Sequence, residues 1–189
     1  MKLVLASTSP RRRDLLGQLG VTPDRIATPD IDEDPRPGEL PRVYALRLAE
    51  EKARAVSRDA DEIVLAGDTT IAVGRRILNK PEDDADHRAM LRLLSGRRHH
   101  CLSAVCVIDR TGTARTRLAD TIVTFKRLSE AEIRAYIASG EGAGKAGGYA
   151  IQGRAAGLVR YLGGSHSGVV GLPLFETRAL LIAAGWPLG

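Results

Sequence analysis

Short hydrophobic runs alternate along the chain with longer stretches in which hydrophobic positions recur every three or four residues. This alternation predicts strands separated by helices and therefore an α/β fold. The predicted strands cover residues 2–6, 63–66, 69–73, 76–79, 100–109 and 113–125, and the predicted helices cover 10–19, 42–57, 83–94, 129–139 and 173–184. Because the two longest predicted strands are adjacent in sequence, we expect a mixed sheet with an antiparallel portion.

Capping and turn residues set the limits of several predicted elements. Ser9 is predicted to be an N-cap, with Pro10 at the first helical position. Residues 129–132, Ser-Glu-Ala-Glu, have the pattern of a capping box. Four prolines and a run of acidic residues between positions 29 and 41 predict an acidic loop. Neither an internal repeat nor a long linker is evident, so residues 1–189 are predicted to form a single domain.

The composition excludes several classes of protein. With 189 residues, 43% of them hydrophobic, the chain is long enough to bury a core and too apolar to be disordered. No run of about 18 apolar residues is present, so we expect no membrane association, and the N-terminal apolar run is too short for a signal peptide. We therefore expect a cytoplasmic protein.

Cysteine and histidine offer no catalytic pattern. Cys101 and Cys106, if they share a strand, point to opposite faces and cannot form a disulfide, so they are predicted to be packing residues. His99, His100 and His166 form no arrangement with a nucleophile and an acid. We expect these histidines to be polar residues of the surface or of a cleft.

The net charge of +5 first favours a nucleic-acid partner. However, arginine supplies 23 of the 28 basic residues and is spread along the whole chain. Aromatic residues are only 4% of the sequence, too few for an evident base-stacking surface. An anionic small molecule would suit the arginines equally well, and no stable nucleic-acid complex is expected.

Three motifs combine residue types that can carry chemistry. Residues 7–12, Ser-Thr-Ser-Pro-Arg-Arg, lie at a predicted strand-to-helix turn, where hydroxyl, N–H and guanidinium groups favour phosphate binding. Asp68 follows a predicted strand and is a candidate general base or metal ligand. Asp32 and Glu33 would complete an oxygen-rich Mg²⁺ or Mn²⁺ site beside it. Each motif also has an ordinary explanation, as a helix cap, a turn aspartate or solvated loop acids.

The lysines are informative because the chain has only five of them. Lys52 flanks a helical stripe, Lys80 precedes a proline, and Lys145 begins a glycine-rich segment. Each of them has the alternative of being a surface residue. The segment 145–153 lacks the spacing of a Walker or dinucleotide motif, but its glycines allow a ligand to approach the backbone closely.

In their joint order and spacing, these motifs resemble those of the Maf family of nucleoside triphosphate pyrophosphatases over nearly the whole chain. The matching motifs are Leu5-Ala6-Ser7-x-Ser9-Pro10-Arg11-Arg12, Glu51-Lys52-Ala53, Gly67-Asp68-Thr69, Lys80-Pro81, Ser95-Gly96-x-x-His99, Val123-x-Phe125, Gly140-Glu141, the segment 145–153 and Val169-Val170-Gly171-Leu172-Pro173-Leu174.

The resemblance implies an elongated mixed sheet with flanking helices, and two lobes around a cleft, akin to the inosine triphosphate pyrophosphatases. It implies hydrolysis of a nucleoside triphosphate to the monophosphate and pyrophosphate with a divalent metal, Mg²⁺ or Mn²⁺. Asp68 matches the family's proposed proton acceptor, and with Glu33 it is the expected metal ligand; Asp32 is the alternative to Glu33. The residues that match the family's triphosphate site are Ser7, Arg11, Arg12, Glu33, Lys52 and Lys80. The resemblance also suggests a homodimer.

Two motifs favour one branch of that family. Asp68-Thr69 and Ile151-Gln152-Gly153 match the branch that resembles a dTTP/UTP pyrophosphatase. Arg11, Thr69 and Gln152 are then the expected specificity positions, because an amide can pair with a pyrimidine carbonyl and N3–H together. The alternatives are a 7-methyl-GTP pyrophosphatase of the sibling branch, or a non-catalytic nucleotide- or nucleic-acid-binding regulator of division, since the family is associated with septum inhibition.

Overall fold

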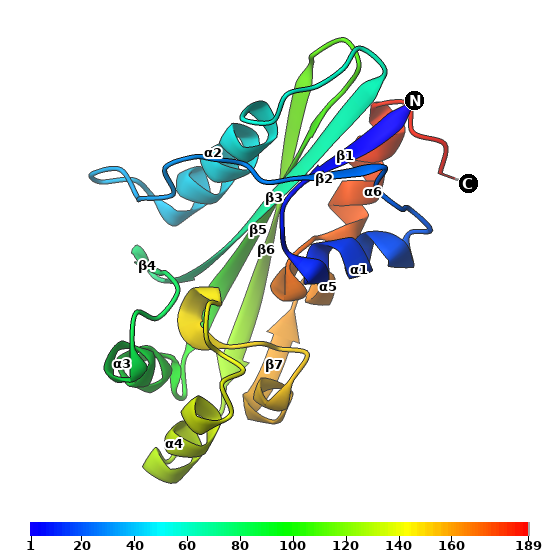
Figure 1. Cartoon of the computed structure of the whole chain (residues 1–189). Coiled ribbons are helices and arrows are strands. Elements are labelled where there is room, and N and C mark those ends of the chain that lie inside the picture. Colours follow the sequence, from blue (N-terminus) through cyan, green and yellow to red (C-terminus); the bar gives the residue numbers. More distant parts are fainter. Residues whose placement is uncertain (189) are drawn as a thin grey trace.

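A computed structural model describes residues 1–188 (Figure 1). Its strands are β1 (Lys2–Ala6), β2 (Arg25–Ala27), β3 (Glu62–Val73), β4 (Arg76–Leu78), β5 (Arg98–Ile108), β6 (Ala114–Phe125) and β7 (Val159–Gly163). Its α-helices are α1 (Pro10–Gln18), α2 (Pro41–Arg54), α3 (Asp84–Leu94), α4 (Glu130–Ala138), α5 (His166–Val170) and α6 (Leu174–Ala183). Two short 3-10 helices, η1 (Ala146–Gly148) and η2 (Arg154–Leu158), lie in the glycine-rich segment.

The strands form one sheet in the order β2-β1-β3-β5-β6-β7. The sheet is mixed, as the sequence predicts. β1 pairs in parallel with both β2 and β3, whereas the pairs from β3 to β7 are antiparallel. β4 folds back on the far end of β3. The long strands β5 and β6 run the length of the molecule, with α3 and α4 near their lower end and the other α-helices farther up along them (Figure 1). The predicted elongated sheet with flanking helices is therefore confirmed.

The first lobe contains β1, the first half of β3 and three helices. Side-chain alternation along β1 directs Leu3 and Leu5 into a core shared with α1 and α6, and it directs Val4 and Ala6 into a second core under α2. Both faces of the sheet are covered here. This explains why the strand reads as a continuous hydrophobic run rather than an alternating one.

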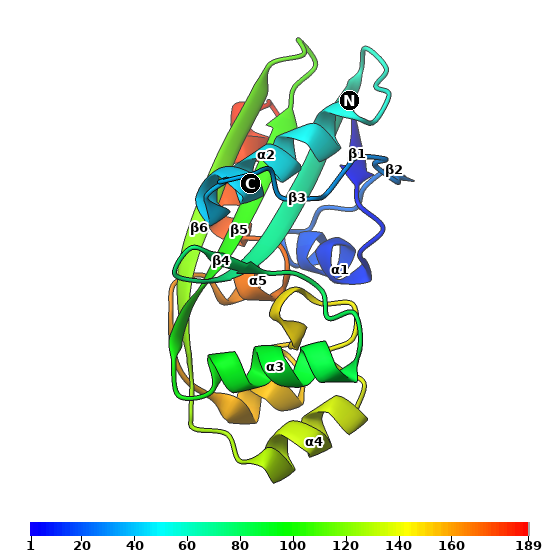
Figure 2. The same ribbon diagram turned by 90° about the vertical axis from the view of Figure 1, so that its left-hand side faces the viewer.

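The second lobe contains the other ends of the long strands, where α3, α4 and the glycine-rich segment cover one face of the sheet. Helices α3 and α4 lie together there with the glycine-rich segment, away from α2 (Figure 2). Their shared core includes Phe125, Tyr149 and Ile133. His99 is fully buried in it, with its ring edge-on to both Phe125 and Tyr149. The expectation that His99 lies at the surface or in a cleft is wrong, and burial lowers the pKa of this imidazole to about 4.

The residues predicted as two strands, 63–66 and 69–73, form the single strand β3. Gly67 does not break the strand, because it passes close to β5: a Cβ built there would lie 3.2 Å from the carbonyl oxygen of Ala104. Asp68 consequently lies in the middle of a strand and not at its end. Ser9 occupies the predicted N-cap position of α1, but its side chain makes no capping hydrogen bond. The capping box of Ser129 and Glu132 is confirmed.

The remaining sequence predictions concern short elements, cysteines and membranes. The strands β2 and β7 and the helix α5 were not predicted, because each has at most five residues and too few hydrophobic positions to show a period. Cys101 and Cys106 are buried and unpaired on β5, in cores on opposite faces, as predicted. None of the helices within residues 1–188 is long and apolar enough to span a lipid bilayer.

The core of the first lobe makes a simple stability prediction. Leu65 is fully buried on β3, so we expect Leu65→Ala to lower the free energy of unfolding by about 2–5 kcal/mol. Ile26→Ala, on the exposed strand β2, is the control and should cost about 1 kcal/mol or less. Urea unfolding followed by Trp186 fluorescence measures both, since Trp186 packs against this core. Equal losses in the two variants would contradict this description of the core.

Candidate active site

A cleft lies where one edge of β3 loses its strand partner. β1 pairs with β3 only as far as Leu65, and β4 begins to pair at Ile71. Within the described part of the chain, no strand pairs with residues 66–70 along this edge. The cleft has a volume of about 720 Å³ and is lined by residues of both lobes. The expectation of two lobes around a cleft is thus confirmed, and this edge of the sheet forms its floor.

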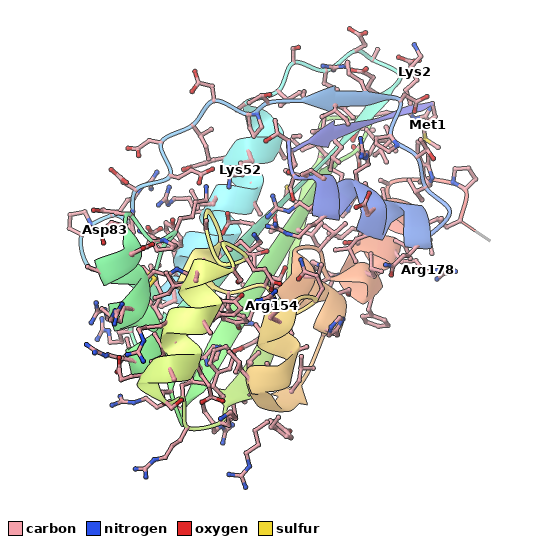
Figure 3. All side chains as sticks on the ribbon, turned by 60° about the horizontal axis from the view of Figure 1, so that its bottom comes forward. Met1, Lys2, Lys52, Asp83, Arg154 and Arg178 are labelled. Atoms are coloured by element: carbon pink, nitrogen blue, oxygen red, sulfur yellow. The ribbon has the colours of Figure 1, made fainter. Side chains whose placement is uncertain are left out.

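Alternation along β3 turns Asp68 and Thr70 toward α2. There the Lys52 ammonium donates a hydrogen bond of 2.8 Å to Asp68 Oδ1. Thr70 Oγ1 donates one of 2.9 Å to Asp68 Oδ2. All three side chains are nearly inaccessible to solvent, and Figure 3 shows Lys52 beside α2. Both donors fix the orientation of the carboxylate, and each oxygen of Asp68 keeps a lone pair for a ligand.

Glu33 brings the acidic loop to the same ammonium. Its Oε1 lies 2.8 Å from Lys52 Nζ, and its Oε2 lies 3.8 Å from Lys80 Nζ. Tyr44 on α2 holds the loop by donating a hydrogen bond of 2.8 Å to the Glu33 carbonyl. Partial burial favours a higher pKa for Glu33, but the hydrogen bond and charge of Lys52, with the charges of Lys80 and Arg12, outweigh it and hold that pKa below its ordinary value.

Of the two acids proposed for the loop, the structure brings Glu33 into the cleft. Asp32 is instead outside the cleft lining, where its Oδ1 accepts a hydrogen bond of 2.8 Å from the backbone N–H of Asp34. This is an Asx turn, the ordinary structural role of an aspartate in a loop. Tyr44 is the residue that sequence reasoning missed, because a tyrosine in a helical stripe reads as a core residue. The nearby carboxylates and burial raise the pKa of its phenol to about 12.

The turn between β1 and α1 supplies two guanidinium groups. Arg12 donates through Nε to the carbonyl of Gly171 at 2.9 Å and through Nη1 to Ser7 Oγ at 3.1 Å. Arg11 donates through Nε to the carbonyl of Val170 at 3.2 Å. These bonds fix both side chains beside the cleft. Burial lowers the pKa of Arg12, and the charge of Asp68 partly compensates.

The opposite wall comes from the glycine-rich segment of the second lobe. Lys145, Tyr149 and Gln152 line the cleft from this side, facing residues of α1 and β3. Thr69 lies on the floor, where its hydroxyl donates a long hydrogen bond of 3.4 Å to the carbonyl of Gly171. The cleft therefore contains every sequence-predicted site residue, namely Ser7, Arg11, Arg12, Glu33, Lys52, Asp68, Thr69, Lys80 and Gln152.

The side chains of the cleft determine whether it can bind a metal ion. Residues 1–188 contain no group of three or more His, Cys, Asp or Glu side chains that could hold a metal ion by themselves. Asp68 and Glu33 are joined through the Lys52 ammonium. Mg²⁺ is commonly bound by one or two carboxylates together with substrate phosphates. The residues present therefore fit a divalent metal that binds with a phosphate-bearing ligand.

Comparison with known proteins assigns the family. A family model described as Maf-like protein matches residues 2–184. The chain is a Maf-like protein. It is 70% identical over 187 residues to a protein of Sphingopyxis alaskensis named dTTP/UTP pyrophosphatase, covering 99% of this chain and 98% of that one. It is 61% identical to one of Novosphingobium aromaticivorans with the same name, covering 97% and 92%.

One solved structure is more distant from this Maf-like protein. The crystal structure of a nucleoside-triphosphatase / dITP/XTP pyrophosphatase from Mycobacterium abscessus is 19% identical, with a TM-score of 0.42. The likeness covers 68% of this chain and 76% of that one. At this level it carries no conclusion about the Maf-like protein.

The contact between the Lys52 ammonium and Glu33 leads to a prediction about the titration of Glu33. Because Lys52 holds the pKa of Glu33 down, we expect Lys52→Met to raise the midpoint of the Glu33 titration. In the wild type, the Lys52–Glu33 interaction stabilises the fold above the ordinary glutamate pKa and weakens as the pH falls through the lowered one. NMR of ¹³C-labelled glutamate carboxyls in metal-free buffer measures the midpoint.

Lys126→Met is the matched control for this titration. Lys126 pairs with Glu132 and holds the pKa of that carboxyl at about 2. Its removal should raise the midpoint of Glu132 and leave Glu33 unchanged. An unchanged Glu33 midpoint in Lys52→Met would mean that the ammonium does not govern this carboxylate.

Proposed function

We propose that this Maf-like protein hydrolyses dTTP and UTP to the nucleoside monophosphate and pyrophosphate. The observation that carries the proposal is the cleft itself, in which Asp68 meets Lys52 and Glu33 beside the fixed guanidinium groups of Arg11 and Arg12. The names of the relatives at 70% and 61% identity, which extend over nearly the whole chain, support the same reaction and the same substrates.

The charges of the cleft suit a triphosphate. A nucleoside triphosphate carries about four negative charges at neutral pH, which must be compensated when water is displaced. Arg11, Arg12, Lys52 and Lys80 contribute four positive charges to the lining. Preorganised cations of this kind stabilise the charge that develops on the leaving pyrophosphate.

Asp68 is the group suited to accept a proton in this reaction. Water attacks the α-phosphorus and transfers its proton to a carboxylate oxygen of Asp68, while the bond between the α-phosphorus and the bridging oxygen breaks. The electron pair of that bond leaves with pyrophosphate. Lys52 and Thr70 orient the carboxylate before the attack. No covalent intermediate is required, which agrees with the absence of a nucleophile pattern in the sequence.

Asp68 and Glu33 are also the residues that would hold a divalent metal, Mg²⁺ or Mn²⁺, together with the phosphates. When bound, such an ion supplies charge neutralisation and Lewis acidity at the phosphate. Lys52, which touches both carboxylates, keeps them close together without the ion.

Thr69 and Gln152 are proposed to select the pyrimidine. They lie on the floor and on the opposite wall of the same cleft. The Gln152 amide can donate to one carbonyl of a pyrimidine and accept from its N3–H.

The alternative specificity, for 7-methyl-GTP, is separated from this one by comparing kcat/KM for dTTP, UTP and 7-methyl-GTP. A homodimer in the cytoplasm remains a prediction, and light scattering measures its mass.

The position of attack can be read from isotope incorporation. In H₂¹⁸O, we expect dTTP to yield pyrophosphate without the label and dTMP with ¹⁸O on its phosphate. Asp68→Asn should lower kcat by about two orders of magnitude or more, as expected for the loss of a general base. Asp120→Asn is the matched control, because Asp120 pairs with His100 away from the cleft lining. Release of orthophosphate alone would refute the pyrophosphatase proposal.

Metal removal tests the proposed role of Glu33. We expect EDTA to abolish turnover and Mg²⁺ or Mn²⁺ to restore it. Glu33→Gln should raise the metal concentration that gives half-maximal activity, because one ligand carboxylate becomes a neutral amide. Asp30→Asn, in the same exposed loop but outside the cleft lining, should leave that concentration unchanged. Full activity in EDTA would exclude a metal requirement.

A further inference from the structure

Lys145 is a cation of the cleft that the proposed mechanism leaves unused. It is one of three lysines in the cleft lining, although the chain has only five lysines. Lys52 and Lys80 both face Glu33, whereas Lys145 comes from the opposite wall. Within residues 1–188, no carboxylate lies within 4.0 Å of its ammonium. Its Nζ makes a single long hydrogen bond of 3.4 Å, to the carbonyl of Ala143.

The backbone that carries Lys145 is held in place by the second lobe. The Lys145 carbonyl accepts a hydrogen bond of 2.9 Å from the N–H of Gly148. The Gly148 carbonyl in turn lies 2.6 Å from Nε2 of the buried His87 on α3. Gly148 has a φ of +70°, and a Cβ there would lie 2.6 Å from the His87 ring. This close packing requires glycine and fixes the start of the wall from which the lysine side chain extends.

Lys145 and Arg11 bring two positive charges into one cleft from opposite walls. Arg11 reaches it from α1 in the first lobe, and Lys145 reaches it from the glycine-rich segment in the second. Burial, followed by the positive charge of Arg11, lowers the pKa of Lys145, and the charge of Glu141 opposes this shift. Like charges that line one cleft repel each other, and an anion bound between them removes that cost.

We propose that Lys145 binds the phosphate chain of the substrate from the glycine-rich wall, opposite Arg11, so that the chain is held between the two lobes. The assignment rests on the proposed function for the identity of the substrate. It names a binding group additional to Ser7, Arg11, Arg12, Lys52 and Lys80. Lys145 makes no contact with Asp68 or Lys52 in the structure, so its role is in binding rather than in proton transfer.

The test measures binding of inorganic tripolyphosphate, which has the phosphate chain but no nucleoside. By isothermal titration calorimetry with Mg²⁺ present, we expect Lys145→Met to weaken this binding by about 10-fold or more, the loss of one charge-assisted contact. The KM for dTTP should rise by a similar factor while kcat stays within about 2-fold, as expected for binding shared by ground state and transition state. Lys145→Arg should recover part of the affinity.

Lys126→Met is again the matched control, because it removes a lysine that pairs with Glu132 outside the cleft lining. Its tripolyphosphate affinity should equal that of the wild type. Thermal unfolding of Lys145→Met should match the wild type, since the half-exposed side chain makes only one weak bond.

Several results would overturn the assignment. Wild-type affinity of Lys145→Met for tripolyphosphate would do so, as would a weakened affinity for dTMP with unchanged tripolyphosphate binding, which would place Lys145 on the nucleoside. A wild-type protein that does not bind tripolyphosphate would also refute it. If Lys145→Met weakens tripolyphosphate binding but no nucleoside triphosphate is hydrolysed, the proposed function fails and the anion-binding role of Lys145 stands.

Discussion

The site depends on one constraint of β-sheet structure, that backbone polar groups along a strand edge need partners. On β3, the edge partners are β1 up to Leu65 and β4 from Ile71. Between them, Asp68 to Thr70 line the floor of the cleft, where water or a ligand can meet the free groups. The interruption in the ladder thus creates the space, while the unbroken pairing with β5 on the other side keeps the floor straight. Asp68 is held at the centre of this rigid strand.

The second element of the site is an ammonium placed between two carboxylates. Burying Lys52 and Asp68 has a desolvation cost that an ion pair alone repays poorly, so such a pair is weak evidence for a stabilising role. The geometry of this ion pair is explained better by a role in the reaction than by a contribution to the stability of the fold. It holds the Asp68 carboxylate in position and draws Glu33 of a proline-rich loop to the cleft. A bound phosphate would compete with the two carboxylates for this ammonium, and a bound metal would compete with the ammonium for the carboxylates.

The sequence predicted the residue types of the site better than their positions. The strand-to-helix turn at Ser7 to Arg12 and the acid Asp68 could be found because each motif follows a strongly hydrophobic run. The continuity of β3 could not be found from the sequence, because a glycine and two threonines end the hydrophobic pattern without ending the strand. The choice of Glu33 over Asp32 depends on the Asx turn and on the hydrogen bond from Tyr44, and neither follows from local sequence. Burial of His99 is likewise a tertiary effect, since its neighbours Arg98 and His100 on the strand are exposed.

The architecture also limits how the two lobes can move. β3, β5 and β6 each have 11 or 12 residues and take part in both lobes, so within residues 1–188 continuous strands join the two lobes. Bending the lobes toward each other would require many ladder hydrogen bonds to deform together. The separation between the glycine-rich wall and α1 is therefore constrained by these continuous strands. A substrate that bridges these walls must match a preformed distance, and a phosphate chain of defined length provides such a match without a large conformational change.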